Sequence, residues 1–412
     1  MTFTLIFTLS LFHFTNFGAQ PYSLLNPVTT IGYDAVLHNP ANLGLNENPN
    51  FSLRLASINA FATNNILSFD SYNQYLGIDS AMNDEQKTEF FRTIPDNGLL
   101  FQGDVNLGTL DFTYRNFGFA FRRFDLGNLK VSKELIDLVL FGNQLQRNYD
   151  FSNFTLDYLS YYSFNFAVGL PLIKKKKQLA TIGIGLKYLL GNQASLTEQA
   201  SGNFYSNEYF IKGQVSWTRN QASGGSGWGF DLGGTYEISK YRFSLALLNI
   251  SPGITWTENL KTNVKSITID STDIYQIVKN NNLNDILNSN DTSYNTESFR
   301  TQIPAYLTLG TGWKFDDFGS MLTLIYEQNL ASTKFSTFTP KFTFDLEWNL
   351  LQVILINPSI SLGGREGITY NLGLGKNLRG FLIGINLGSI KNPIITKAKG
   401  LKLGLSIGLT LP

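Results

Sequence analysis

The last residues of the chain alternate strictly between large aliphatic side chains and small or polar ones. From Leu401 to Leu411 every second residue is leucine or isoleucine, and the residues between them are Lys, Gly, Ser, Gly and Thr. Such alternation is typical of a β-strand with two chemically different faces. A tilted strand needs roughly 9–11 residues to cross a bilayer. The segment therefore predicts a membrane-spanning strand with one face toward lipid and the other toward a polar lumen.

Composition agrees with a barrel of such strands. The chain has 412 residues, of which 43% are hydrophobic, yet its mean hydropathy is only −0.06. Beyond the N-terminus no run of eighteen apolar residues occurs, which excludes helical membrane spans. Alternation hides the apolar residues of a membrane barrel from bulk hydropathy. The net charge of +1 argues against a nucleic-acid-binding surface, so no nucleic-acid partner is expected.

The alternating pattern recurs along the chain, and the lengths of the connections predict topology. Long connections, at 62–105, 125–153, 191–225 and 251–302, all fall on one side, as in outer-membrane barrels. We therefore predict an all-β, transmembrane antiparallel barrel of about 14 strands, with both termini in the periplasm and the long loops extracellular. Residues 208–218 also alternate and are interpreted as a hairpin arm within the third long loop. The predicted strands are 51–61, 106–115, 117–124, 154–170, 179–190, 226–237, 241–250, 303–315, 320–330, 339–349, 352–362, 367–375, 379–389 and 399–411.

The long loops contain helix signals. Asn83 and Gln86 form a capping-box pattern that predicts a helix to about Arg92. Ser132 likewise precedes an apolar stretch at 133–141 that Gly142 ends. Apolar spacing predicts a third, amphipathic helix between residues 273 and 288. These helices either form a lid that captures an apolar ligand or partner, or only pack on the barrel mouth.

The N-terminus resembles a secretory signal peptide. Residues 3–14 are apolar, and small residues follow at Gly18 and Ala19, which predicts a signal peptide over residues 1–19. The segment has no lysine or arginine, since the first in the chain is Arg54. A plain N-terminal strand is the alternative interpretation.

Charged residues of both signs lie opposite the apolar faces of the predicted strands. Unpaired charges in a narrow interior are costly, so a network of paired charges in the lumen is expected. Such a network mainly rigidifies a barrel and closes it to ions. A substrate-binding role for Arg115 or Arg122 is the alternative. The predicted network consists of Arg54, Asp111, Arg115, Arg122, Asp231, Lys314, Glu327, Asp345 and Glu347, together with Lys187.

Enzymatic chemistry finds little support. After signal removal the only histidine is His38, the chain has no cysteine, and no cluster has metal-ligand spacing. We expect no catalytic residue, cofactor or bound metal.

Several segments resemble the FadL-type outer-membrane transporters and their PorV-like relatives of the type IX secretion system. These segments are Ala35–Gly44 (AVLHNPANLG), Ile303–Trp313 (IPAYLTLGTGW) and Gly229–Trp256. Two loop pieces, at 83–98 and 134–143, resemble an uncharacterised Bacteroidota branch of this superfamily more closely. The resemblance covers most of residues 30–412.

The resemblance implies an organisation and a choice of functions. Residues 20–50 would form a hatch inside the lumen, with Asn39, Pro40 and Ala41 at its bend, and residues 51–412 would form the barrel in the outer membrane. A FadL-like protein passes hydrophobic small molecules, with a lateral opening at a kinked third strand, here 117–124. A PorV-like protein instead binds an exported protein through its extracellular loops. A purely structural barrel with a sealed lumen is the third possibility.

Overall fold

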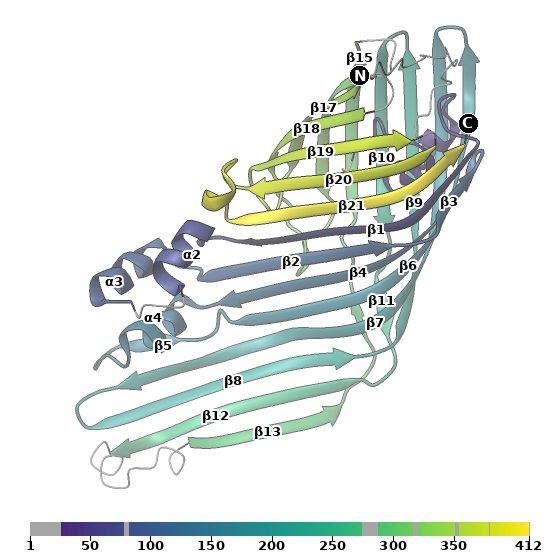
Figure 1. The fold of residues 1–412 in the computed structure, drawn as a ribbon. Coiled ribbons are helices and arrows are strands. Elements are labelled where there is room, and N and C mark those ends of the chain that lie inside the picture. Colours follow the sequence, from purple (N-terminus) through teal and green to yellow (C-terminus); the bar gives the residue numbers. More distant parts are fainter. Residues whose placement is uncertain are drawn as a thin grey trace, which may run out of the picture.

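The computed structural model describes residues 26–77, 82–273, 287–315, 320–350, 354–378 and 380–411. Within them the strands form a closed, antiparallel, 14-stranded barrel, which confirms the predicted fold class (Figure 1). The last strand pairs with the first and closes the ring. In order around the ring, the strands are β1 (Phe51–Asn64), β2 with β3 (Leu99–Gly108 and Asp111–Tyr114), β4 (Phe117–Val131), β6 (Thr155–Lys175), β7 (Gln178–Ser206), β9 (Gly225–Ile238), β10 (Tyr241–Ile250), β15 (Tyr306–Lys314), β16 (Met321–Asn329), β17 (Lys341–Leu350), β18 (Ile354–Gly363), β19 (Thr369–Leu378), β20 (Phe381–Ile390) and β21 (Gly400–Leu411).

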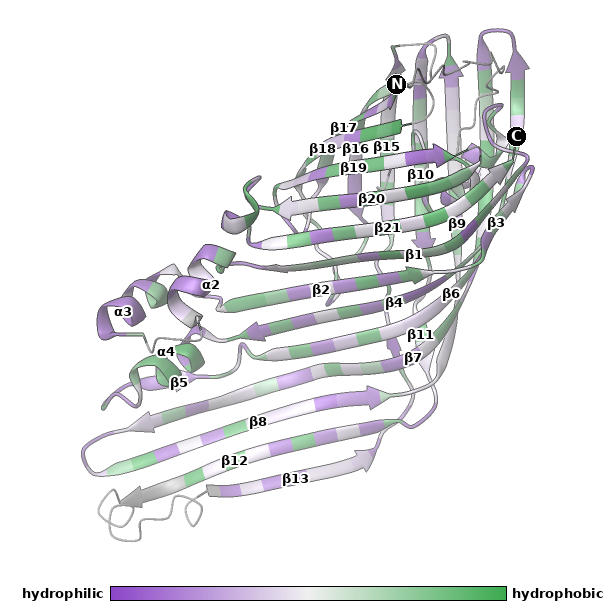
Figure 2. Cartoon of the chain, viewed as in Figure 1, coloured by the Kyte–Doolittle hydropathy of each residue, from purple (hydrophilic) through white to green (hydrophobic). Residues whose placement is uncertain are grey.

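The barrel is inverted relative to a water-soluble protein. In β21, Leu403, Leu405 and Ile407 are about 40% exposed, whereas the intervening Gly404 and Ser406 are buried. Figure 2 shows the same alternation of hydrophobic and hydrophilic residues along the other barrel strands. Large apolar side chains therefore cover the outer face, and polar or small residues fill the interior. This is the arrangement that alternation predicts for a barrel in lipid.

The second strand of the barrel, rather than the third, is interrupted. β2 and β3 both pair with β1, and between them Leu110 has a φ of 60°, in the left-handed region. β1 carries a register shift between Arg54 and Ala56 at the same level. The third strand, β4, pairs with β6 without interruption from Phe117 to Lys130. The ladder of β4 is interrupted only on its β2–β3 side, and the kink of the third strand stays a prediction.

The barrel sheet extends beyond the ring on the side of the long loops. β7 has 29 residues, and its C-terminal part continues beyond the barrel and pairs with β8 (Phe210–Ala222). This pairing confirms that residues 208–218 belong to a hairpin arm. β8 pairs with β12 (Lys261–Asp273), which pairs with β13 (Leu287–Asn295), and Figure 1 shows these strands side by side. The ends of the helix predicted at 273–288 thus lie in strands, and residues 274–286 lie outside the described residues. The remaining short strands are β5 (Asn148–Asp150), β11 (Ile254–Trp256) and β14 (Phe299–Thr301).

The other two predicted loop helices form as expected. α3 (Asp84–Thr93) begins with a capping box between Asn83 and Gln86, and α4 (Lys133–Phe141) is capped by the Ser132 side chain and ends at Gly142, whose φ is 73°. α2 (Phe69–Leu76), which the sequence analysis did not predict, packs near them and near η4 (Ile395–Lys397). The three helices stand together beyond the ends of β1, β2 and β4 (Figure 1). No helix among the described residues is both long and apolar enough to cross a membrane.

The N-terminal segment, residues 26–50, lies inside the barrel. It contains η1 (Gly32–Asp34), α1 (Ala35–His38) and η2 (Pro40–Gly44), and most of its residues are buried. η2 packs against β6, β7 and β9 near the short connections between these strands. We call that side of the barrel the turn end and the opposite side the loop end.

Candidate functional site in the barrel lumen

Three glycines on neighbouring strands form the surface on which Asn39, Pro40 and Ala41 lie. Gly169 in β6 is paired with Gly183 in β7, which is paired with Gly233 in β9. A Cβ at these positions would lie 2.3 Å from the Pro40 carbonyl oxygen, 2.2 Å from the Ala41 nitrogen and 2.0 Å from Asn39 Oδ1, respectively. Since real Cβ atoms do not approach so closely, only glycine lets the N-terminal segment lie this near the wall.

The Asn39 side chain holds this contact with hydrogen bonds. Its amide nitrogen donates to Thr235 Oγ1 at 3.0 Å and to Ser244 Oγ at 2.8 Å, while its oxygen accepts from the Ala41 nitrogen at 3.0 Å. Asn42 Nδ2 similarly donates to the Pro27 and Thr30 carbonyls. Both asparagines are fully buried, so their side chains depend on these hydrogen bonds in place of bonds to water.

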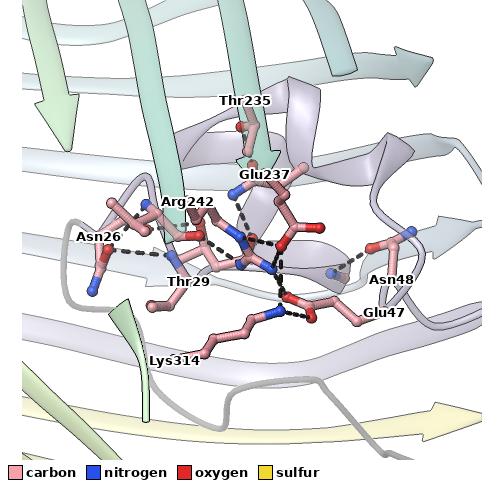
Figure 3. Close-up of polar contacts among 12 residues, drawn as sticks. Asn26, Thr29, Glu47, Asn48, Thr235, Glu237, Arg242 and Lys314 are labelled. Atoms are coloured by element: carbon pink, nitrogen blue, oxygen red, sulfur yellow. Dashed lines mark hydrogen bonds and ion pairs between the residues drawn. The ribbon is translucent and has the colours of Figure 1, made fainter. Parts of the chain in front are cut away.

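A cluster of charges joins the N-terminal segment to β9, β10 and β15 (Figure 3). Glu47 forms ion pairs with Arg242 and, at 2.8 Å, with Lys314. Arg242 also pairs with Glu237 and donates to the Val28 carbonyl at 2.8 Å. Burial alone would raise the pKa of Glu47, but the two cations outweigh burial and lower this pKa to about 2. Glu47 is therefore ionised at neutral pH and holds the segment to the wall.

A second charged cluster surrounds α1 and η1. Asp111 pairs with Arg122 at 2.5 Å and with Arg54 at 3.3 Å, and Arg54 also pairs with Asp34 of the N-terminal segment. The ring of Tyr33 lies 4.2 Å from the Arg54 guanidinium carbon. All of these side chains are almost completely buried, and opposite charges balance each other, as the cost of burying single charges requires.

The structure brings most of the predicted lumen residues into such contacts. Asp231 pairs with Lys187 at 2.9 Å, and Asp345 accepts hydrogen bonds from Asn26 and Asn357. Glu347 is buried, and Glu327 lines the lumen. Arg115 is the exception, since it is exposed in the turn between β3 and β4 with a φ of 53°. Side chains alternate between the lumen and the outer face only within a paired strand. Arg115 lies one residue past the end of β3, so the alternation does not determine its direction.

Several charged residues of the lumen were not predicted. Arg242 lies between the outward-facing Tyr241 and Phe243, so the alternation of β10 would have predicted that its side chain faces the lumen. Arg365 and Glu366 lie in the turn between β18 and β19, where a period of two gives no information. Among the described residues, no group of three or more His, Asp and Glu side chains is placed to hold a metal ion.

A cavity of about 400 Å³ lies in the lumen above the N-terminal segment. Leu37 and His38 line it on the side of that segment, and Phe335 lines it on the side of the loop end. Apolar side chains from β4, β6 and β7 form one part of its wall, and the polar side chains of Arg122, Asn165 and Lys187 line the cavity from the same strands. Another part, on β1, β2, β19, β20 and β21, carries amides and paired charges. The apolar lining includes Phe124, Leu126, Tyr161, Leu189, Ile303 and Phe335.

The loop at 330–339 folds inward and bounds this cavity. Phe335 is 4% exposed and belongs to a buried cluster that also contains Tyr161 and Trp256. Its carbonyl accepts a hydrogen bond from Arg365 at 2.8 Å, and Lys334 pairs with Asp157 of β6 at 3.2 Å. The helices α2 to α4, which were candidates for this position, instead pack around a separate cluster at Ile66, Leu67, Tyr75, Phe90 and Ile94 and are absent from the cavity lining.

Comparisons with known proteins agree with this architecture. The model of a family of unknown function, DUF5723, matches residues 40–218 and 192–386. No curated protein has a significantly similar sequence. The toluene transporter TbuX of Ralstonia pickettii is similar in structure, with 13% identity, a TM-score of 0.51 and coverage of 96% of this chain and 99% of that one. The TodX deltaS2S3 mutant, a monoaromatic hydrocarbon channel, has 10% identity, a TM-score of 0.52 and coverage of 92% and 94%. At these identities the likeness establishes the fold.

Proposed function

We propose, from the premise that the chain belongs to the DUF5723 family and has a FadL-type barrel fold, that it lets hydrophobic small molecules pass through an outer membrane. The solved barrels of this fold include a toluene transporter and a monoaromatic hydrocarbon channel. The exposed apolar belt of the barrel supports a location in lipid. Residues 1–19 remain a predicted signal peptide and lie outside the described residues.

The lumen cavity carries this proposal. It is about 400 Å³, within the usual range for small-molecule sites, and Phe124, Tyr161 and Leu189 give it an apolar side. A lumen packed solid with side chains would not support passage. The cavity instead offers space between the N-terminal segment and the loop at 330–339.

The N-terminal segment acts, in this proposal, as the hatch predicted for residues 20–50. Its described part fills the turn end of the barrel and is held by the Asn39 hydrogen bonds and the Glu47 ion pairs. With the long loops extracellular, the hatch would separate the cavity from the periplasm. The paired lumen charges would then close the pore to ions in the resting state.

Direct detection of the ligand tests the proposal. The barrel would be extracted from its own outer membrane in mild detergent and analysed by native mass spectrometry. We expect hydrophobic small-molecule adducts that disappear when Leu189→Trp fills the cavity, whereas Leu322→Trp, an outward change on β16, leaves them in place. Adducts that persist in Leu189→Trp would place the ligand elsewhere and count against the proposal.

The alternative, in which the extracellular loops bind an exported protein, has no specific observation in its favour. The protruding strands β8, β12 and β13 offer a surface, but a surface alone identifies no partner. A stoichiometric protein partner in the same mass spectra, with no small-molecule adduct, would favour that alternative.

A further inference from the structure

We propose that the lumen cavity binds an uncharged amphipathic molecule with an apolar face and hydroxyl groups along one edge, in preference to a plain hydrocarbon. This inference rests on the proposed function and names the class of compound that the site accepts. It follows from two features of the cavity wall, a row of asparagines and a neighbouring group of apolar side chains.

One part of the wall carries a row of asparagines on adjacent strands. Asn59 in β1 is paired with Asn106 in β2 on one side and with Gly404 in β21 on the other. Gly404 is in turn paired with Asn386 in β20. Asn371 in β19 extends the row, and all four asparagines line the cavity. The row is therefore continuous across five neighbouring strands of the barrel.

Three of the four side-chain oxygens of this row lack partners in the protein. Within the described residues, Oδ1 of Asn106, Asn371 and Asn386 has no hydrogen-bond partner, and neither has Oδ1 of Asp104 in β2. Asn371 and Asn386 are only 7% and 6% exposed. A buried amide oxygen without a hydrogen-bond donor is costly. Several such groups lining one cavity wall are suited to hydrogen bonds with a bound molecule.

Glycines leave the space that these amides occupy. A Cβ at Gly388 would lie 2.3 Å from Asn371 Oδ1, and a Cβ at Gly404 would lie 2.9 Å from Asn59 Oδ1. Hydroxyl groups both donate and accept hydrogen bonds, so they match an asparagine in either orientation of its amide. A carboxylate or an ammonium group would match only one orientation.

A neighbouring part of the wall suits an apolar ring. Phe124 and Tyr161 are stacked with their centroids 5.0 Å apart, and Leu126, Leu189 and Ile303 belong to or pack on the same buried cluster. This apolar part of the wall lies next to the amide row, since Asn106 in β2 is paired with Phe124 in β4. Aromatic faces of this kind contribute contact area without requiring a hydrogen bond.

Seven of the ten Asp, Glu, Lys and Arg side chains that line the cavity form ion pairs, which favours an uncharged ligand. Arg365 forms an ion pair with Asp104, and Lys402 pairs with Glu366 at 2.6 Å. The turn residue Glu366 has a pKa of about 2, because the nearby cations Lys402 and Lys341 outweigh the effect of burial. A charged ligand would have to break one of these pairs in a low-dielectric interior.

Two probes that differ only in hydroxyl groups test the inference. Binding of toluene and of 4-methylcatechol to the full barrel in nanodiscs would be measured by saturation-transfer-difference NMR, with protein-free nanodiscs subtracted. We expect the wild-type barrel to bind 4-methylcatechol at least 10-fold more tightly than toluene. Asn371→Ala/Asn386→Ala should weaken 4-methylcatechol binding about 10-fold and change toluene binding less than 2-fold. Leu189→Ala should weaken the binding of both probes.

Each result separates this inference from the proposed function. Equal or tighter binding of toluene, or unchanged 4-methylcatechol binding in the asparagine variant, would overturn the inference while leaving passage of hydrophobic compounds intact. Binding of neither probe would contradict both. If the double variant does not migrate as a folded barrel in an unheated gel, the single variants Asn106→Ala and Asn386→Ala provide the same comparison.

Discussion

Gly233 lies directly beneath the side chain of Asn39, and a Cβ at Gly233 would come within 2.0 Å of Asn39 Oδ1. Its neighbour Gly234 points to the other side of the wall, where a Cβ would meet no heavy atom within 4 Å. A side chain would therefore be excluded sterically at Gly233 but not at Gly234. One permits a close contact with the N-terminal segment, and the other makes no such contact.

The first prediction compares these two positions. Gly233→Ala should displace Asn39 from Thr235 and Ser244 and lower the free energy of unfolding by about 1–3 kcal/mol, the usual cost of overpacking. Gly234→Ala should change it by less than about 0.5 kcal/mol. The midpoint of urea unfolding, followed by circular dichroism, measures both. Equal losses in the two variants would show that glycine matters here for strand geometry and not for the contact with Asn39.

The second prediction concerns Asn39 itself. Asn39→Leu removes the donor to Thr235 and Ser244 and the acceptor for the Ala41 nitrogen. The two hydroxyls keep their bonds to Asn42 and to the Pro27 carbonyl, whereas the buried Ala41 nitrogen loses its acceptor, at a cost of about 1–3 kcal/mol. We expect the N-terminal segment to become sensitive to protease while the barrel remains folded. Asn46→Ala, an exposed change in the same segment, is the control. Protection equal to that of the wild type in Asn39→Leu would contradict a holding role for this residue.

Much of the barrel could be predicted because lipid on one side and a polar lumen on the other impose a two-residue period on every strand. A strand between lipid and lumen must alternate, so Trp228, Phe230 and Leu232 point outward while Asp231 points inward. The same alternation predicts Arg54, Asp111 and Arg122 on the inner face, where the structure pairs Asp111 with both arginines. Strand ends are harder to predict, since β4 and β7 continue to Val131 and Ser206, beyond the predicted ends at residues 124 and 190.

Other features depend on contacts that a local pattern does not contain. Glu47 lies outside any strand, and its role comes from Arg242 and Lys314, which are far away in sequence. The inward fold of the loop at 330–339 depends on Phe335 meeting residues of several other strands. The prediction for Arg115 was wrong because the strand pattern was extended one residue past the end of β3, where the chain turns and the side chain is exposed. Period two holds within a strand and stops at its end.

The third prediction is a dependence of stability on pH through Glu47. Its pKa is about 2 in the folded protein and near 4.5 when exposed, so it contributes stability above about pH 4.5 that is lost as the pH falls toward 2. Glu47→Gln should lower the thermal midpoint at pH 7 and flatten its pH dependence between pH 4.5 and 2.5. The control Glu85→Gln, an exposed change in α3, should keep the wild-type profile. A Glu47→Gln profile parallel to that of the wild type would assign the acid sensitivity to other carboxylates.

The last prediction concerns the inward loop. Phe335 is 4% exposed in the apolar cluster, whereas Phe338 in the same loop is 57% exposed. Because removing a buried phenylalanine ring costs roughly 3–5 kcal/mol, Phe335→Ala should release the loop from the wall, although Lys334 still pairs with Asp157. Hydrogen exchange of the amides at 330–339 should become at least 10-fold faster in Phe335→Ala and stay unchanged in Phe338→Ala. A loop that stays protected in Phe335→Ala would mean that the contacts of Lys334 and Arg365 suffice to hold it, and that the phenylalanine ring is not what keeps the cavity covered.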